Sequence, residues 1–294
     1  MNFEVAPKGF PLYYDPRGEG GNRGGGAHGF MAHDYERTSD SLNIPLQSDD
    51  AVIQPRKGKG DPALGPDALM VVISQDLARL SKLKPMDSFD QGFFKIFRDK
   101  GQTEAGLSLA GPFLGAPQAA MVMEKIIALG AKRICLFGWC GSLQPDLRIG
   151  DLLIPLHAIA EEGTSKHYPI GKSKPGTDPG LNRILERALE QEGLPFRKGT
   201  VWTTDAPYRE TASKVKTYRE KEVLAVEMEI SALMTLAIYR SVKLSGLLVV
   251  SDELFDLKWH RGFSSPLFKK RCEQAGNLLV NQVFGRDQTG SVGH

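Results

Sequence analysis

Runs of continuously hydrophobic residues alternate along this chain with longer segments in which hydrophobic residues recur every three to four positions. Short continuous runs are typical of strands covered on both faces, and the recurring pattern is typical of helices packed on a sheet. The predicted strands are residues 68–74, 107–110, 133–137, 151–155, 199–204 and 244–250. The predicted helices are residues 117–129, 179–192, 226–239 and 266–284. This alternation predicts an α/β fold, a single domain with a mostly parallel mixed central sheet flanked by helices.

The first part of the chain lacks this pattern. Residues 18–29 are dominated by glycine, and residues 54–66 are rich in glycine, proline and lysine. Such a composition buries too little surface to offset its ordering entropy. We therefore divide the chain into a Gly/Pro-rich N-terminal arm, residues 1–65, and an α/β domain, residues 66–294. The arm is either flexible and dependent on a partner, or it packs along the surface of the domain.

Composition and charge argue against several classes of protein. The 294 residues carry a net charge of +2, which is too balanced to favour binding to nucleic acid or to a membrane surface. No hydrophobic run approaches the roughly 20 residues that cross a bilayer, and the first residues lack the basic and hydrophobic regions of a secretory signal. We expect a cytoplasmic protein whose three cysteines are reduced.

Acidic residues follow hydrophobic stretches at two places in the second half of the chain. Glu227 and Glu229 flank Met228 where a helix is predicted to begin, and Asp252 follows the last predicted strand. Burying a carboxylate costs several kcal/mol unless something binds it, so acids at such places usually serve a ligand. In parallel sheets ligands bind beyond the carboxyl ends of strands, where Gly138 and Asp252 are both expected. The neighbouring Glu253 is expected to be solvated.

Several short motifs occur in the order in which they stand in one enzyme superfamily. They are Gly111-Pro112 with Gly115-Ala116-Pro117, Gly138-x-x-Gly141-x-Leu143-Gln144-Pro145, Gly150-Asp151, Thr204-Asp205-Ala206-Pro207-Tyr208, Val226-Glu227-Met228-Glu229 and Val250-Ser251-Asp252. From about residue 69 to residue 253 the chain thus resembles the nucleoside phosphorylase superfamily, which includes purine nucleoside and uridine phosphorylases. The resemblance implies an enzyme, a pentosyltransferase that cleaves the N-glycosidic bond of nucleosides by phosphorolysis to free base and ribose 1-phosphate.

The resemblance also implies roles for single residues. Glu229 would accept hydrogen bonds from the 2′- and 3′-hydroxyls of ribose, and Met228 would pack on the sugar. Asp252 resembles the acid that protonates N7 of a departing purine, a step worth roughly 10²–10⁴-fold in rate. The residues that fall in the family's base-binding region are Tyr208, Arg209 and Glu227. The structural alternatives are that the glutamates only favour a helix N-terminus, that Asp252 only caps the next segment, and that Tyr208 and Arg209 belong to a surface loop.

The phosphate-binding part departs from the family pattern. The first loop, Pro-Gly-Asp-Pro-x-Arg in the family, keeps its arginine as Arg79 but has Gln75 in place of glycine. In the second loop, Leu136 replaces an arginine and Trp139 replaces serine or threonine, which removes a charge-assisted contact. Arg133 cannot substitute, because three residues along a strand put it on the other face. The phosphate-binding residues that the resemblance implies are Arg79, Gly138 and Trp139.

Two alternatives to phosphorolysis remain open. One is a nucleoside hydrolase of the same fold, with Asp76 as its base, and the other is a nucleoside-binding module with little turnover. We expect no cofactor and no metal site, with inorganic phosphate as a co-substrate. We also expect a homo-oligomer, dimeric or hexameric, since folds of this kind complete their sites with a neighbouring subunit. The sequence leaves the identity of the base, purine or pyrimidine, open.

Overall fold

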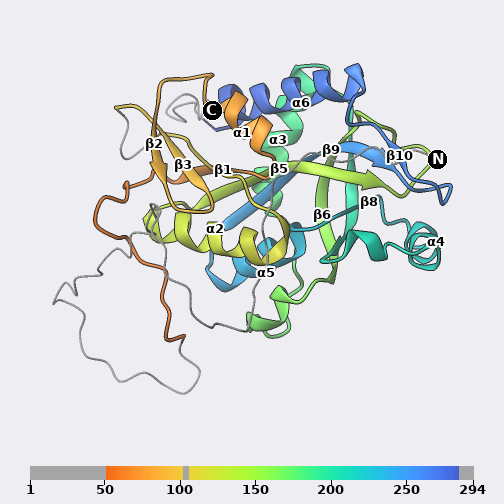
Figure 1. The fold of residues 1–294 in the computed structure, drawn as a ribbon, viewed down its shortest axis with the longest axis horizontal. Coiled ribbons are helices and arrows are strands. Elements are labelled where there is room, and N and C mark those ends of the chain that lie inside the picture. The colour runs from red at the N-terminus through yellow and green to blue at the C-terminus, as the bar shows by residue number, and fades with distance from the viewer. Residues whose placement is uncertain (1–50, 102–105, 285–294) are drawn as a thin grey trace, which may run out of the picture. The chain divides into compact units, whose positions relative to one another are not determined.

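The computed structural model describes residues 51–101 and 106–284, all of which belong to one compact unit spanning Leu46–His294. The predicted N-terminal arm is therefore described only from residue 51 onward. Its last part packs against the domain, because the Lys125 ammonium group contacts the Asp61 carboxylate at 2.6 Å and the carbonyl oxygen of Arg56 at 3.0 Å. Leu64 is buried and donates its backbone N–H to the carbonyl of Leu129. All of these contacts are made with residues of α2, the first long helix of the domain (Figure 1).

The described strands form one mixed sheet in the order β10-β9-β6-β7-β8-β5-β1-β4-β3-β2. The central neighbours β4, β1, β5 and β9 are parallel, whereas the β2–β3 hairpin is antiparallel. Because β9 pairs with both β5 and β6, the strands β5, β9, β6, β7 and β8 close into a ring. The strands are β1 (Asp67–Val71), β2 (Met86–Asp90), β3 (Lys95–Asp99), β4 (Ser108–Gly111), β5 (Arg133–Ser142), β6 (Leu152–Glu161), β7 (Phe196–Thr204), β8 (Ala225–Glu227), β9 (Lys243–Glu253) and β10 (His260–Arg261).

Helices cover the sheet on both faces. Helices α2 and α5 pack on one face, and α1, α3 and α6 pack on the other (Figure 1). The helices are α1 (Ser74–Leu80), α2 (Gly115–Leu129), α3 (Pro179–Gln191), α4 (Ala212–Glu220), α5 (Ile230–Tyr239) and α6 (Pro266–Leu278). Among the helices described here, none combines the length and hydrophobicity that crossing a bilayer requires. The predicted α/β fold with a mixed central sheet flanked by helices is confirmed.

Strand β5 shows why the predicted strands read as continuous hydrophobic runs. Ile134 and Leu136 face the core beneath α2 and α5, while Cys135 and Phe137 face the core beneath α3 and α6. All four side chains are fully buried. A strand covered on both faces has no position at which a polar side chain reaches water, so the two-residue alternation disappears.

Several strands extend farther than predicted, including β6, which ends at Glu161, and β7, which begins at Phe196. β5 continues through Gly138 to Ser142 rather than ending at residue 137, and β9 continues to Glu253 rather than ending at residue 250. β5 and β9 pair along their whole length, and these backbone hydrogen bonds keep glycine and polar residues in the ladder. Asp252 therefore lies within a strand instead of after one.

The predicted helix over residues 226–239 was wrong at its beginning. Ala225–Glu227 form β8, which pairs with β5 and with β7, and α5 begins only at Ile230. Backbone pairing on two sides outweighs the favourable helix propensity of the Glu-Met-Glu segment, because tertiary context overrides propensity. The β2–β3 hairpin and α4 were not predicted, because their polar sequences offer neither a hydrophobic run nor a hydrophobic stripe.

Candidate functional site

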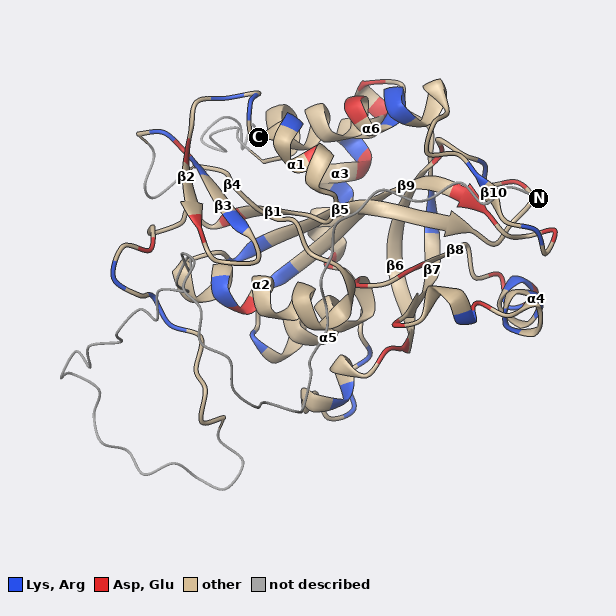
Figure 2. Cartoon of the chain, viewed as in Figure 1, with Lys and Arg blue, Asp and Glu red and all other residues tan. Residues whose placement is uncertain are grey.

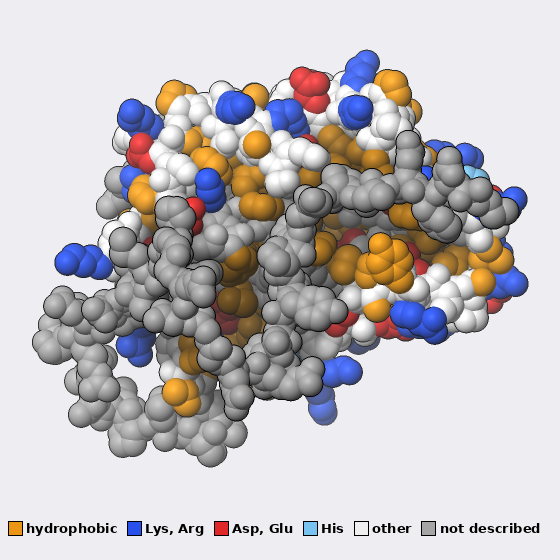
Figure 3. Space-filling view, in the orientation of Figure 1, with side chains coloured by type: hydrophobic (Ala, Val, Ile, Leu, Met, Phe, Trp, Pro, Cys, Tyr) orange, Lys and Arg blue, Asp and Glu red, His pale blue; other side chains and the backbone are white. Residues whose placement is uncertain are grey.

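The strand register brings the predicted acids to one edge of the sheet. Gly141 in β5 pairs with Val226 in β8 on one side and with Asp252 in β9 on the other. Glu227 and Glu229 follow Val226 directly, so they lie where the carboxyl ends of β5 and β9 meet β8. Figure 2 shows acidic residues at this end of β9, and Figure 3 shows acidic side chains among hydrophobic ones in the middle of the face that it presents. Such an edge is where α/β sheets bind ligands.

A bulge in β9 directs Asp252 toward this edge. Cys140 in β5 pairs with Val250 in β9. The next residue, Gly141, pairs with Asp252, so Ser251 is the extra residue of the bulge. Bulges are common beside active sites, where they turn a side chain to a new direction. A Cβ atom at Gly141 would lie 3.0 Å from Oδ2 of Asp252, so glycine leaves room for the carboxylate.

The Asp252 carboxyl group makes one hydrogen bond at each oxygen. Ser251 Oγ lies 2.6 Å from Oδ1, and the indole N–H of Trp259 donates to Oδ2 at 2.8 Å. Trp259 lies close to Asp252 because β10 folds back on β9 as an antiparallel hairpin, in which Arg261 pairs with Asp252. Burial raises the pKa of Asp252 above its ordinary value. A carboxyl group held in this way can keep a proton and deliver it to a bound molecule.

Glu229 is buried at the N-terminus of a helix. Its Oε1 accepts a hydrogen bond of 2.7 Å from the backbone N–H of Gly115, the first residue of α2. Gly115 has a φ of +77°, a conformation that glycine adopts without strain, and it turns this N–H toward the carboxylate. Burial raises the pKa of Glu229 to about 7, although the N–H groups of Gly115 and Met228 favour the ionised form. Met228 lies beside it and is half-buried.

Glu227 caps the helix that follows it. Its Oε2 accepts the backbone N–H groups of Glu229 at 2.8 Å and Ile230 at 2.7 Å, and its Oε1 accepts the hydroxyl of Thr203. Burial, with the nearby charge of Glu229, raises the pKa of Glu227 to about 8. These bonds give the carboxylate a place in the framework that holds Glu229, and its part in base binding stays a prediction.

The pKa values of Glu227 and Glu229 predict how stability depends on pH. Both values are raised from the ordinary 4.5, so between about pH 4.5 and pH 8 the folded protein binds more protons than the unfolded chain. The free energy of unfolding therefore falls as the pH rises through this window. We expect the melting temperature measured without nucleoside to fall between pH 5 and pH 8, and Glu229→Gln to reduce that fall. The control variant Glu186→Gln on α3 should keep the wild-type slope, and an equal slope in Glu229→Gln would contradict the assignment.

The predicted base-binding loop lies on the surface. Tyr208 and Arg209 belong to a 3₁₀ turn after β7, Pro207–Arg209, and the Tyr208 side chain is 95% exposed. The next residue, Glu210, is half-buried, and burial with the charge of Asp252 raises its pKa to about 7. Glu210 is thus the loop residue whose charge interacts with Asp252, whereas base binding by Tyr208 and Arg209 remains a prediction.

Two of the predicted phosphate-binding residues, Arg79 and Trp139, contact Asp76 and α6. Arg79 donates through Nη1 to Oδ1 of Asn277 at 3.1 Å and through Nη2 to the carbonyl oxygen of Cys272 at 2.9 Å. Nη2 also lies 3.3 Å from Oδ1 of Asp76, a buried residue. Trp139 donates its indole N–H to the other oxygen of that carboxylate at 3.1 Å. In this arrangement Arg79 and Trp139 converge on Asp76, and their contact with phosphate stays a prediction.

Two further residues have clear packing roles. A Cβ atom at Gly138 would lie 2.9 Å from Cγ2 of Val72, so glycine is needed for packing whether or not a ligand binds there. Arg133 forms a bidentate ion pair with Asp67, with both N···O distances at 2.6 Å, which uses its guanidinium at the other end of β5.

The expectation that Glu253 is solvated was wrong. Its side chain is buried, and its Oε1 accepts hydrogen bonds from Nε of Arg148 at 2.9 Å and from the backbone N–H of Ile149 at 3.0 Å. The carboxylate therefore ties β9 to the loop before β6.

Sequence reasoning missed three residues at this site. Ser251 and Trp259 contact Asp252, and Glu210 interacts with it electrostatically. Ser251 belongs to the motif Val250-Ser251-Asp252 but was given no role of its own, and Glu210 directly follows Tyr208 and Arg209 in the sequence. No local signal points to Trp259, because its position depends on the β9–β10 hairpin.

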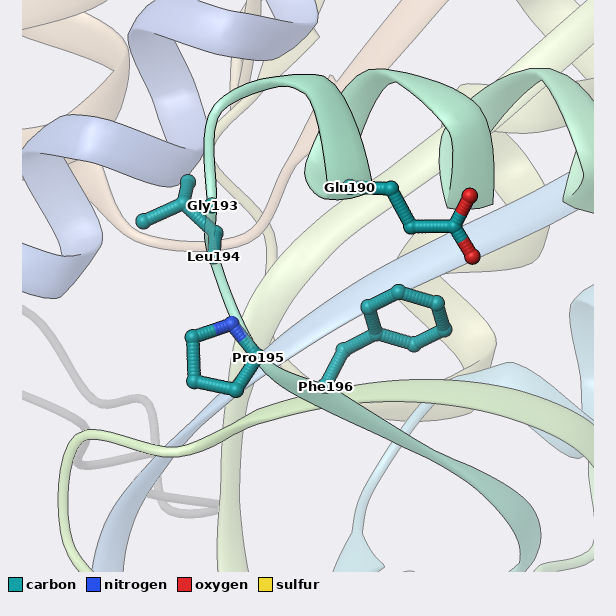
Figure 4. A pocket seen from close by; sticks show the side chains of 5 residues that line it. All are labelled: Glu190, Gly193, Leu194, Pro195 and Phe196. Carbon is teal, nitrogen blue, oxygen red and sulfur yellow. The ribbon is translucent and has the colours of Figure 1, made fainter.

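In the part of the chain that the structure describes, neither a cluster of metal ligands nor the hollow beside α3 is a stronger candidate than this edge. No three histidine, cysteine or acidic side chains gather there as a metal site would require. An open hollow of about 580 Å³ lies at the turn between α3 and β7, lined by Glu190, Gly193, Leu194, Pro195 and Phe196 (Figure 4). It adjoins the beginning of β7, away from the acids, and offers one charged side chain. The acid-lined edge is the stronger candidate.

Comparison with known proteins gives consistent matches. One family model, described as the phosphorylase superfamily, matches residues 67–280. The chain is 33% identical over 151 residues to a DeoD-type purine nucleoside phosphorylase of Bacillus cytotoxicus, a match that covers 51% of this chain and 64% of the relative. Purine nucleoside phosphorylase from Toxoplasma gondii, solved in complex with immucillin-H, superposes with a TM-score of 0.69 at 20% identity, over 81% of this chain and 97% of that one. Uridine phosphorylase from Vibrio fischeri gives a TM-score of 0.67 at 18% identity, over 75% and 92%.

Proposed function

Since the chain belongs to the phosphorylase superfamily, we propose that it cleaves the N-glycosidic bond of a purine nucleoside by phosphorolysis, which releases the free base and ribose 1-phosphate. One observation carries the proposal: the buried carboxylate of Glu229 lies at the N-terminus of α2, on the same sheet edge as Asp252. The similarity to purine nucleoside phosphorylases supports it, although the chain spans only 64% of the length of the curated relative.

Glu229 would serve the sugar. Cleavage of the glycosidic bond passes through a state in which the ribose ring carries positive charge. A carboxylate close to that ring stabilises the charge, and its two oxygens can accept both hydroxyls of a vicinal diol. The N–H of Gly115 and the dipole of α2 favour the ionised form that this role requires. Met228, half-buried beside it, would pack on the sugar.

Asp252 would serve the leaving base. A purine leaves more readily when N7 receives a proton as the bond breaks, and a carboxyl group whose pKa is raised by burial holds that proton to higher pH than a solvated one. Asp252 lies at the sheet edge that Glu229 also reaches, so one nucleoside would meet both groups.

The nucleophile is the part of the reaction with a second candidate. Arg79 and Trp139 both contact Asp76, and three acceptors already engage the Arg79 guanidinium. This favours water as an alternative nucleophile, with Asp76 as its base. Phosphorolysis remains the first proposal, because the phosphorylase relatives support it and a neighbouring subunit would be able to supply a cation.

The two reactions are separated by a panel of purine and pyrimidine nucleosides, incubated with the full chain with and without phosphate. We expect a purine base to be released only when phosphate is present, with ribose 1-phosphate as the second product on chromatography. Equal rates without phosphate would favour hydrolysis. Binding by calorimetry without turnover would indicate a nucleoside-binding module, and no binding at all would overturn the proposal.

The assembly proposed for this function is a homo-oligomer, dimeric or hexameric. Leu114 and Met121, on the helix whose N-terminus holds Glu229, are 68% and 58% exposed, which suits a surface covered by a second copy. Light scattering on the purified chain measures the mass directly, and a monomer at assay concentration would contradict this assembly.

A further inference from the structure

The hydrogen bonds around Asp252 restrict where its proton can reside. Oδ2 faces the indole N–H of Trp259 at 2.8 Å, a group that can only donate. Oδ1 lies 2.6 Å from Oγ of Ser251. The same hydroxyl oxygen lies 3.1 Å from the backbone carbonyl oxygen of Cys140, which can only accept. The Ser251 hydroxyl therefore stands between two oxygens and has one proton to give.

The donors and acceptors around Ser251 favour one arrangement of the hydrogen bonds. If Ser251 donates to the carbonyl of Cys140, the short contact with Oδ1 is a hydrogen bond only when Oδ1 itself carries a proton. Every donor then has an acceptor, and Asp252 is neutral. If Ser251 donates to Oδ1 instead, the carbonyl of Cys140 receives no proton, and Ser251 Oγ and that carbonyl oxygen meet as two acceptors at 3.1 Å.

The surroundings of Asp252 favour its neutral form. The titratable groups that face it are Glu210 from the loop after β7, Cys140 from β5 and Glu253 within β9, and none of these is basic. Among the described residues, no basic side chain lies within ion-pair distance of Asp252. The nearby guanidinium of Arg261 stacks over the ring of Trp259 instead, 5.4 Å from its centroid.

The backbone fixes the hydroxyl in place. Ser251 is the extra residue of the bulge in β9 and is buried. Its own carbonyl accepts the N–H of Gly262 at 2.8 Å, and a Cβ atom at Gly262 would lie 2.7 Å from that oxygen. The bulge thus holds the Ser251 hydroxyl between Asp252 and Cys140, independently of any ligand.

We propose that Ser251 is a positioning residue for the acid of the reaction: its hydroxyl accepts a hydrogen bond from the protonated carboxyl group of Asp252 and later donates one to the carboxylate that remains. This inference rests on the function proposed above. When a purine takes the place of Trp259, a half-turn of the carboxyl group about its Cβ–Cγ bond brings the protonated oxygen to N7 and the unprotonated oxygen to Ser251, whose hydroxyl turns from the carbonyl of Cys140 to donate to it.

Atoms and electrons balance in this step. The O–H bond of Asp252 breaks and an N–H bond forms at N7, while the C1′–N bond breaks with its electron pair going to the base. Asp252 is left as a carboxylate, which the Ser251 hydroxyl stabilises. The incoming hydrogen phosphate forms the C1′–O bond and loses a proton, and that proton restores Asp252 through solvent.

A pair of substrates tests this role. A purine nucleoside such as inosine needs protonation at N7, whereas 7-methylinosine is already cationic there and leaves as a neutral base without it. We expect Ser251→Ala to lower kcat for inosine by about 10–100-fold, part of the full effect of a general acid, and to leave 7-methylinosine within about twofold. Ser251→Thr, which keeps the hydroxyl, should restore most of the rate. Equal loss on both substrates, or no loss on either, would overturn the proposal.

Two further readouts separate this role from a merely structural one. Because the Ser251 hydroxyl accepts from the neutral acid, Ser251→Ala should move the alkaline limb of the kcat/KM profile to lower pH. A serine that only donates to an ionised carboxylate would move that limb to higher pH, and this result would overturn the inference.

Infrared difference spectroscopy, with Asp252→Asn as the reference, should show the C=O stretch of a protonated carboxyl group near neutral pH, weakened in Ser251→Ala. This measurement needs no turnover. An inactive protein with that band would contradict the proposed function alone, and an active protein without it would contradict the role of Ser251 alone.

Discussion

Replacing Glu229 by glutamine is expected to lower kcat/KM for a purine nucleoside by about 10²–10³-fold. The variant would lose two charge-assisted hydrogen bonds to the ribose hydroxyls and the negative charge beside the sugar cation, together about 3–4 kcal/mol of transition-state stabilisation. Because much of this loss belongs to the transition state, kcat should fall with kcat/KM. Steady-state kinetics with phosphate at saturation measure both.

The fold should tolerate this change, since the amide oxygen of glutamine can still accept the N–H of Gly115. Circular dichroism and the melting temperature check this point. Glu186→Gln, on α3 and paired with Lys198, is the matched control and should keep wild-type kinetics. A Glu229→Gln variant that stays within threefold of the wild type would show that this carboxylate only serves the helix N-terminus.

Replacing Asp252 by asparagine is expected to lower kcat for inosine by about 10²–10⁴-fold, the range of a lost general acid. Asparagine matches the neutral acid in shape: its oxygen can accept from Trp259, and its NH₂ group can donate to Ser251. The hydrogen bonds are therefore kept while the transferable proton is lost. The same variant should cleave 7-methylinosine far more readily than inosine.

The test compares kcat for inosine with kcat for 7-methylinosine at one pH. Because kcat is measured at saturation, a change in affinity does not affect the comparison. If Asp252→Asn slowed both substrates equally, the residue would act through the structure of the bulge rather than as an acid. If it slowed neither, the leaving base would receive its proton from another group.

Hydrophobic runs were sufficient to predict six of the strands in the described sheet, β1, β4, β5, β6, β7 and β9, but not β2, β3, β8 or β10. Ile134 to Phe137 are buried on both faces, and a short run of this kind is typical of a strand in the middle of a covered sheet. The motif around Glu229 then added a carboxylate to the candidate site. Its hydrogen bond to Gly115 joins residues 114 positions apart. Both residues belong to the ordered motifs, and no other feature of the sequence indicates that they are close in space.

What the sequence could not supply depends on contacts between distant segments. The bulge at Ser251 arises from the register between β5 and β9, which no local pattern encodes. Arg79 resembles a phosphate ligand in sequence, yet its guanidinium reaches Asn277 and the carbonyl of Cys272 on α6. The sequence suggests that Glu227 faces a ligand. Its Oε2, however, accepts hydrogen bonds from two backbone N–H groups that converge on it only when α5 forms.

The ring of strands β5, β9, β6, β7 and β8 constrains how copies of this chain can associate. Within the described residues it leaves only β2 and β10 with a free side, at the ends of the sheet. β10 consists of His260 and Arg261, and β2 carries Asp87 and Asp90, so both borders are short and charged. Lengthening the sheet through backbone pairing is therefore disfavoured. In the proposed homo-oligomer, subunits would therefore meet through side chains on helices and loops.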